Sequence, residues 1–187
     1  MKTMKINMAS LFWILGFFFI SINGISQDNN LSRQEKKEWK RAQMNANFII
    51  LDSLLNAKSF VLEADFLQNT YGDRIPVVSN LNFVKVDKSK GILQTGSDFR
   101  VGNNGVGGVT AQGTVGGWKL SKNFKSLSYN LRFNLLTNLG NYDIFMTVTS
   151  DNHATATITG LGPGRLTWEG HLVTVNNSRV FKGLETF

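Results

Sequence analysis

Apolar and polar side chains alternate along most of this chain from Ser59 onward, and this rhythm constrains the fold more than any other feature. Segment 127–135 is the cleanest case, with Leu127, Tyr129, Leu131, Phe133 and Leu135 separated by Ser128, Asn130, Arg132 and Asn134. Successive side chains of a strand point to opposite faces, so the pattern predicts half-buried antiparallel strands. Parallel strands, which are covered on both faces, would be continuously apolar.

The same alternation predicts further strands, which we place at 59–67, 82–86, 92–95, 109–120, 142–149, 154–159 and 166–172. Turn sequences such as Asp87–Gly91 and Gly160–Gly164 separate them. Nine of the eighteen glycines lie between Gly91 and Gly117, so we interpret 96–109 as a long loop and 109–120 as a kinked strand. About seven or eight consecutive strands predict a mainly β fold, an antiparallel barrel or a strongly curled meander, because closure removes exposed sheet edges.

A single helix precedes the strands. Ser32-Arg33-Gln34-Glu35 fits a capping box, in which the serine and glutamate side chains satisfy backbone N–H groups of the first turn. Beyond it, apolar residues recur at steps of three and four: Trp39, Ala42, Ala46, Ile49, Ile50, Leu54 and Ala57. We expect this stripe to pack on the barrel, with the helix ending near Asn56 or Lys58.

The first residues have the layout of a secretory signal peptide. Lys2 and Lys5 precede the apolar run 11–22, and the small residues Gly24 and Ser26 follow it. The alternative is a membrane anchor, but a spanning helix needs about 20 apolar residues and this run is shorter. We therefore divide the chain into a signal peptide (1–26), an N-terminal helix packed on the barrel (27–58) and a barrel domain (59–187). We expect the protein to be exported to the periplasm or secreted, and not to be an integral membrane protein.

Composition excludes several classes of function. The chain has no cysteine, which excludes disulfide scaffolds, thiolate metal sites and cysteine nucleophiles, and only two histidines. Residues 32–41 carry five basic and two acidic side chains, a net charge of +3. Such a cluster attracts phosphate polymers or an anionic membrane, although a solvated helix face is the simpler interpretation. Without interleaved aromatic residues for base stacking, we expect no nucleic-acid partner.

Several segments together resemble the bacterial domain-of-unknown-function family 4251. They are Ala57–Asp65 (AKSFVLEAD), Leu81–Asp87 (LNFVKVD), Val106–Val109 (VGGV), 142–150, Ala154–Ile158 (ATATI) and Leu166–Gly170 (LTWEG), and they span nearly the whole chain after the leader. The resemblance implies a lipocalin-like antiparallel barrel exported by Bacteroidetes-type bacteria. These motifs are structural, and the family brings no known activity.

Candidate catalytic groups are few. His153 lies in a predicted turn, and Glu169 and His171 share a strand face without any nucleophile motif beside them. Glu63 and Asp65, two residues apart, resemble a pair of catalytic carboxylates, but we prefer to interpret them as a solvent-facing polar strand edge. Asp151, Asn152 and His153 supply too few ligands for a metal. The loop Gly102–Gly108 lacks the following helix that a phosphate-binding loop needs. We therefore expect that the protein is not an enzyme and binds no cofactor.

The inward face is the more promising place for a site. An eight-stranded barrel is either filled by its side chains or holds one small ligand. The candidate ligand contacts are the large inward residues Trp118, Tyr129, Phe133, Met146 and Trp168. Our hypothesis is an exported, non-catalytic barrel that binds a small apolar or amphipathic molecule; the alternative is a protein-interaction or structural module with a partner protein in the cell envelope.

Overall fold

A computed structural model of the chain describes residues 32–97, 102, 104–160 and 164–187; the predicted signal peptide and part of the predicted glycine-rich loop lie outside them. The chain divides into two compact units, residues 1–36 and 37–187. In the described part of the first unit, Glu35 donates its backbone N–H to the Ser32 hydroxyl at 3.2 Å, and its carboxylate accepts the Ser32 N–H at 2.7 Å. These two bonds confirm the capping box and lower the pKa of Glu35.

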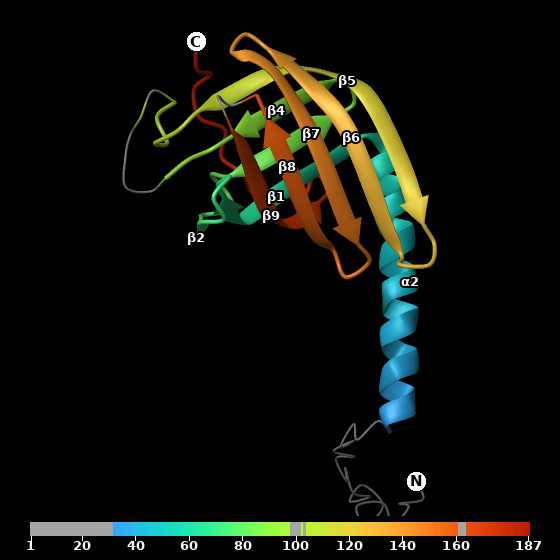
Figure 1. The fold of residues 1–187 in the computed structure, drawn as a ribbon. Coiled ribbons are helices and arrows are strands. Elements are labelled where there is room, and N and C mark those ends of the chain that lie inside the picture. Colours follow the sequence, from blue (N-terminus) through green and yellow to red (C-terminus); the bar gives the residue numbers. More distant parts are fainter. Residues whose placement is uncertain (1–31, 98–101, 103, 161–163) are drawn as a thin grey trace, which may run out of the picture. The chain divides into compact units, whose positions relative to one another are not determined.

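The second unit is a closed antiparallel barrel with the helix at its N-terminal side (Figure 1), which confirms the predicted fold class. Its elements are helix α2 (Arg33–Ala57) and strands β1 (Ser59–Gln68), β2 (Arg74–Pro76), β3 (Phe83–Asp87), β4 (Lys90–Gln94), β5 (Thr110–Asn123), β6 (Ser128–Thr137), β7 (Gly140–Thr149), β8 (His153–Thr159) and β9 (Arg165–Val173). The strands follow the order β2-β1-β3-β4-β5-β6-β7-β8-β9, and β1 also pairs with β9. Eight strands therefore form the ring, while β2 extends alongside the second half of β1. The sequence interpretation did not include β2.

The predicted alternation sets the barrel core. Inward residues of β6 and β7 lie opposite one another in pairs such as Leu131 with Met146 and Phe133 with Ile144. Both pairs are buried, and so is Trp168 of β9. Because every ring strand has a neighbour on each side, its inner face can be apolar without leaving a backbone edge exposed there.

A β-bulge at Asp65 makes one predicted side-chain orientation wrong. The alternation along the predicted strand 59–67 places Phe60, Leu62, Ala64 and Phe66 on one face. In the structure the register between β1 and β9 shifts between Ala64 and Phe66. One extra residue exchanges the faces of all that follow. Leu67 therefore points inward and is buried, whereas Phe66 lies outside with the Arg74 guanidinium 3.4 Å from its ring centre.

Helix α2 packs on the barrel through a different stripe from the predicted one. Its buried residues are Phe48, Leu51 and Leu55, while Ile49 and Ile50 are 66% and 57% exposed. The two stripes have similar spacing, and Leu54 of the predicted one is partly buried against the core. The buried stripe presents only bulky side chains over the last three turns, where the predicted one includes Ala57. Filling the end of the barrel with larger side chains removes more apolar surface from water.

The C-terminal residues 174–187, here called the tail, cover part of the outer barrel surface. Val61 and Phe83 point outward from β1 and β3, yet both are fully buried. The tail is held to this region by backbone bonds, including Phe181 N–H to Asn80 C=O at 2.9 Å and Leu184 N–H to Asn104 C=O at 2.8 Å. The barrel thus has an outer apolar cluster besides its core.

Candidate functional site

The five predicted interior residues lie on the inner face, and four of them are fully buried in the core. Tyr129, Phe133, Met146 and Trp168 are at most 2% exposed. Trp118 is partly buried; its ring centre lies 5.3 Å from that of Phe133, and the Lys58 amine lies 5.2 Å above it. These side chains therefore belong to the packed core, and their predicted contact with a ligand stays a prediction.

The indole of Trp168 has one unusual property. Its Nε1–H is buried and has no hydrogen-bond partner among the described residues. Buried donors are nearly always paired, and an unpaired one costs about 1–3 kcal/mol. Trp168 lies on β9 directly beside Leu67 of β1 and Ala156 of β8. An unsatisfied donor is thus held in the apolar layer next to Leu67.

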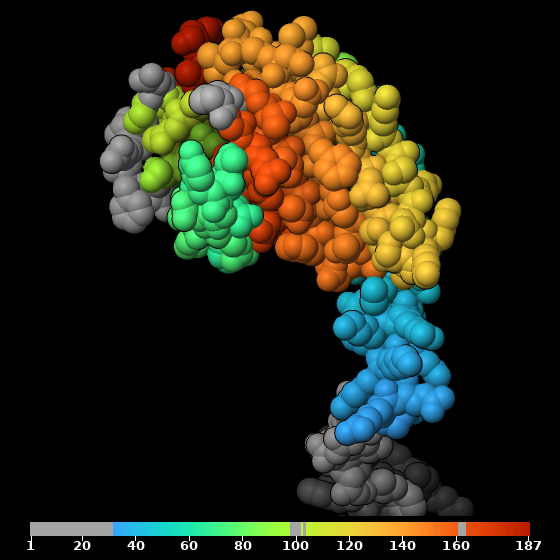
Figure 2. Space-filling view, viewed as in Figure 1, coloured from blue at the N-terminus to red at the C-terminus, as the bar shows by residue number. Residues whose placement is uncertain are grey.

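Leu67 also borders a hollow of about 320 Å³ at the end of the barrel opposite helix α2, which we call the mouth hollow. Its lining is Leu67, Ile75, Pro76, Val77, Val78, Asn82, Thr95, Gly96, Ser97 and Gly107. Leu67 lies near the end of β1, and Ile75 and Pro76 lie in β2. The other lining residues follow β2 or β4 or precede β3 or β5, so strand ends position the hollow. The segment around β2, drawn in green, protrudes beside this end of the barrel (Figure 2). The lining is mostly apolar, and its polar side chains are Asn82, Thr95 and Ser97.

Asn82 fixes the shape of the mouth hollow. Its side-chain amide donates to the carbonyls of Val78 and Gly96, both at 3.0 Å, and its Oδ1 accepts the Gly96 N–H at 3.0 Å. The side chain is fully buried, so these bonds replace those it would make to water. One asparagine therefore ties the segment after β2 to the segment after β4.

The described part of the glycine-rich loop is organised by Asn104. Its Oδ1 accepts the backbone N–H groups of Val106 and Gly108 at 3.1 and 2.9 Å, and its amide donates to Thr110. A phosphate-binding loop needs such N–H groups free to face the anion. Here two of them are already bonded within the loop, which agrees with the expected absence of a nucleotide motif.

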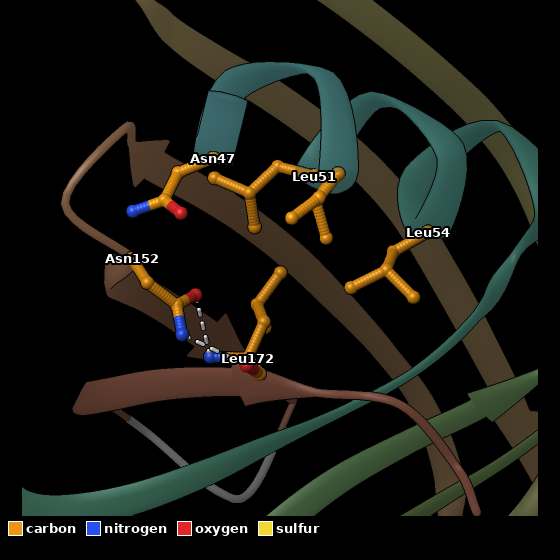
Figure 3. A pocket seen from close by; sticks show the side chains of 6 residues that line it. Asn47, Leu51, Leu54, Asn152 and Leu172 are labelled. Carbon is orange, nitrogen blue, oxygen red and sulfur yellow. Dashed lines mark hydrogen bonds between the residues drawn. The ribbon is translucent and has the colours of Figure 1, made fainter. Parts of the chain in front are cut away.

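A smaller hollow of about 140 Å³ lies between helix α2 and the turn after β7 (Figure 3). Asn47, Leu51 and Leu54 reach into it from the helix, opposite Asn152 and Leu172. The side chain of Asn152 is already used, because it donates to the Leu172 carbonyl at 2.9 Å and accepts the Leu172 N–H at 3.2 Å. This hollow is a gap in the packing of the helix rather than a polar recognition site.

The predicted acid–base residues lie together on the outer face of β1, β2 and β9, in a charged band that consists of Glu63, Asp65, Arg74, Glu169 and His171. His171 lies between two carboxylates, with its Nε2 3.8 Å from Glu63 and its Nδ1 3.4 Å from Asp65. Ser178 donates its hydroxyl to Glu63 at 2.5 Å, not to the imidazole. Glu169 accepts from the Arg74 guanidinium at 2.7 and 3.0 Å and does not orient His171. The arrangement is a partly exposed group of polar contacts that includes the Arg74–Glu169 ion pair.

The turn that carries Asp151, Asn152 and His153 is also internally bonded. Asp151 accepts the Thr149 hydroxyl at 2.5 Å and the His153 N–H at 3.3 Å. The Thr149 bond, more than the backbone N–H, lowers the pKa of Asp151 against a smaller opposing effect of burial. In the part of the chain that the structure describes, no three His, Asp or Glu side chains converge to hold a metal.

The described residues form no helix that is both long and apolar enough to cross a bilayer. The fold defines a class of protein: a closed eight-stranded antiparallel barrel with one helix at its N-terminal side. Residues 40–172 match the family described as domain of unknown function DUF4251, and the chain belongs to that family.

The chain is also similar to a solved member of the family. The crystal structure of a DUF4251 family protein from Bacteroides eggerthii DSM 20697, at 1.95 Å resolution, aligns with a TM-score of 0.61 and 34% sequence identity. The alignment covers 73% of this chain and 93% of that one. A comparison with curated proteins gave no match. These similarities confirm the predicted resemblance to the family and support the barrel fold. They indicate no activity.

Sequence reasoning missed the residues of the mouth hollow. Ile75, Val77 and Val78 belong to a short segment without a clear period, and we assigned no strand there. The available signal was a cluster of apolar residues around Pro76, in a stretch too short for the alternation to be recognised.

Proposed function

We propose that this protein is an exported, non-catalytic module that binds a small apolar or amphipathic molecule at the mouth of its barrel. The mouth hollow carries the proposal. Its volume of about 320 Å³ is at the lower end of the range of ligand pockets, roughly 300–1,000 Å³, and such pockets are mainly apolar with a few polar groups. Ile75 and Val78 keep 57% and 40% of their surface exposed there, which a ligand would cover.

The chemistry around the hollow favours an amphipathic ligand over a purely apolar one. Thr95 and Ser97 contribute hydroxyl groups to its lining, and the unpaired Trp168 N–H lies in the apolar layer beside Leu67. A ligand oxygen that reached this N–H would supply the missing acceptor. The ligand would then contact Trp168, one of the interior residues predicted from the sequence.

Native mass spectrometry of the protein purified from the periplasm of its own cells tests the proposal first, because a retained small molecule would appear as added mass. Binding of the neutral fluorophore N-phenylnaphthylamine then locates the site. We expect Ile75→Lys and Val78→Lys, both at exposed positions, to weaken binding about tenfold or more, since each brings a charge to an apolar hollow. The control is Leu136→Lys, at an exposed position of β6 outside the hollow. Equal binding by all three variants would contradict the proposal.

The alternative, a protein-interaction module, has its own supporting observation. Trp39, Ile49 and Ile50 form an exposed apolar stripe on helix α2, with exposures of 63%, 66% and 57%. Exposed apolar patches often mark contact surfaces. Copurification of a stoichiometric envelope protein that is lost in Ile49→Ser, without any retained small molecule, would favour this alternative.

A further inference from the structure

We propose that the helix end of the barrel docks on the surface of an anionic lipid bilayer. The docking surface consists of Lys37, Lys40 and Arg41 on helix α2 together with the tip of the β5–β6 hairpin, Lys122–Lys125. Two independent features support the proposal. One is the positive charge of one helix face, and the other is the exposed aromatic side chain of Phe124, which lies between Lys122 and Lys125 in the sequence.

The charged helix face is the continuation of the face that packs on the barrel. Lys37, Arg41, Met44, Phe48, Leu51 and Leu55 follow one another at steps of three and four, so they line one side of the helix. In the C-terminal half this side is buried on the barrel. In the N-terminal half the same side carries Lys37 and Arg41, with Lys40 next to it, and all three are exposed. A basic surface therefore begins where the contact with the barrel ends.

The hairpin tip is fixed against the same side of the helix (Figure 2). The Phe124 ring centre lies 6.0 Å from that of Phe48, and Lys122 forms an ion pair with Asp52 at 2.6 Å. Asn123 accepts the backbone N–H groups of Lys125 and Ser126 at 3.0 and 3.1 Å, which orders the turn. Phe124 nevertheless remains 74% exposed.

The charge of these segments favours an anionic partner. The docking surface carries five basic side chains (Lys37, Lys40, Arg41, Lys122 and Lys125), and the acidic Glu38 and Asp52 lie beside them, so the net charge is 5 − 2 = +3. Anionic lipid surfaces attract such clusters within a Debye length.

Phe124 distinguishes a bilayer from a soluble polyanion. An exposed aromatic ring next to a lysine suits the bilayer interface, where the Phe124 ring enters the acyl boundary and the ammonium group of the exposed Lys125 stays among the phosphates. A phosphate polymer in water offers no such apolar layer. The mouth hollow lies at the opposite end of the barrel, so a docked molecule keeps it open to solvent.

Vesicle cosedimentation tests the proposal with the chain from Gln27 onward, which lacks the apolar run 11–22 and retains every described residue. The vesicles are phosphatidylcholine with or without phosphatidylglycerol. We expect binding only to the anionic vesicles, with a decrease as salt is added. The triple variant Lys37→Gln, Lys40→Gln, Arg41→Gln should bind about a hundredfold more weakly, from roughly fivefold for each charge near the surface. Phe124→Ser should weaken binding roughly tenfold.

The controls match each change elsewhere on the molecule. The variant Arg132→Gln, Arg165→Gln, Arg179→Gln removes the same charge from three exposed residues outside the docking surface and should bind like the wild type, as should Phe187→Ser. Absence of binding to anionic vesicles, or equal loss in the two triple variants, would overturn the proposal. A soluble polyphosphate that binds as tightly as the vesicles, together with an unaffected Phe124→Ser variant, would overturn it in favour of a polymer.

Discussion

Tyr129 joins the helix to the barrel by two contacts of one side chain. Its ring stacks on Phe48 with 4.5 Å between the ring centres, and its hydroxyl donates to the Phe48 carbonyl at 2.9 Å. Burial, and to a lesser degree the Asp52 carboxylate, raises the pKa of Tyr129 to about 12. The folded state therefore favours the protonated phenol, which is the form that donates this hydrogen bond.

The raised pKa predicts a loss of stability in alkali. The phenol titrates near 10.0 in the unfolded chain and at about 12 in the fold. Its contribution is therefore fully present below pH 10 and is lost as the pH rises from about 10 to 12. Tyr129→Phe should lower the free energy of unfolding by about 1 kcal/mol at neutral pH and reduce its decline above pH 10. Urea titrations across this range measure both effects.

Tyr142 provides the comparison for that experiment. Burial also raises the pKa of Tyr142, against a smaller opposing effect of the nearby Thr137 side chain. Tyr142→Phe should retain the part of the alkaline decline that belongs to Tyr129. If the decline were the same in wild type and Tyr129→Phe, the assignment to Tyr129 would be wrong.

Gln94 is a second residue whose side chain joins distant segments. Its amide donates to the carbonyls of Leu81 and Phe181 at 3.1 and 2.8 Å, and its Oε1 accepts from the Thr110 hydroxyl and the Gly183 N–H. The side chain is fully buried. All its hydrogen-bonding capacity is used, so one glutamine holds the tail against β4 and β5.

Replacing this glutamine should release the tail before it unfolds the barrel. Gln94→Leu leaves buried partners on the tail and on the barrel without their bonds, so we expect a loss of roughly 3 kcal/mol. Hydrogen exchange at the Gly183 amide should accelerate, because that N–H loses its acceptor. Gln112→Leu is the control, since Gln112 also contacts the tail, through Lys182, but at the exposed surface. Unchanged exchange at Gly183 would show that the tail is held by other contacts.

At the scale of elements, the sequence predicted most strands because their alternation is local. In β6, Tyr129, Leu131 and Phe133 are each flanked by polar residues, and every one of them is buried as expected. The helix was located by its capping box for the same reason. Two features could not be predicted from the local sequence, because each depends on what the segment packs against. The bulge at Asp65 arises from pairing with β9, and the helix face that is buried depends on the shape of the barrel end.

Substitutions on the two faces of helix α2 test directly which apolar stripe packs on the barrel. Leu55→Ala should cost roughly 3 kcal/mol, because Leu55 is fully buried in the core and its truncation leaves a cavity. Ile49→Ala, on the predicted but exposed stripe, should change stability by less than about 0.5 kcal/mol. Thermal and urea unfolding of the two variants measure the difference. Equal losses would mean that the predicted stripe is also buried in solution, as self-association would cause.

At the scale of the whole molecule, closure of the barrel joins the first ring strand to the last. β1 and β9 pair from Val61 with Val173 to Gln68 with Thr167, and these partners are 99 to 112 residues apart in sequence. No local pattern contains such a contact, so the sequence left open whether the sheet closes or only curls. The mouth hollow could not be predicted for the same reason: its lining comes from strand ends that are far apart in sequence.

Gly170 shows what closure demands of a single position. It lies opposite Ala64 in the β1–β9 ladder, next to the bulge, and a methyl group there would overlap the Glu63 carbonyl oxygen. Gly170→Ala must therefore separate the two strands locally, and we expect a loss of roughly 1–3 kcal/mol. Hydrogen exchange should accelerate along β1 and β9 but not at the β6–β7 ladder, which lies across the ring.

Gly116→Ala is the matched change within another strand. A methyl group on Gly116 comes within 3.0 Å of only the Asn134 Oδ1, the end of a side chain that can rotate away. It should therefore leave both stability and exchange nearly unchanged. If Gly170→Ala were equally mild, β1 and β9 would not be in close contact in solution, and the molecule would be a curled sheet with two free edges. If exchange instead accelerated uniformly around the ring, the barrel would open only as one cooperative unit.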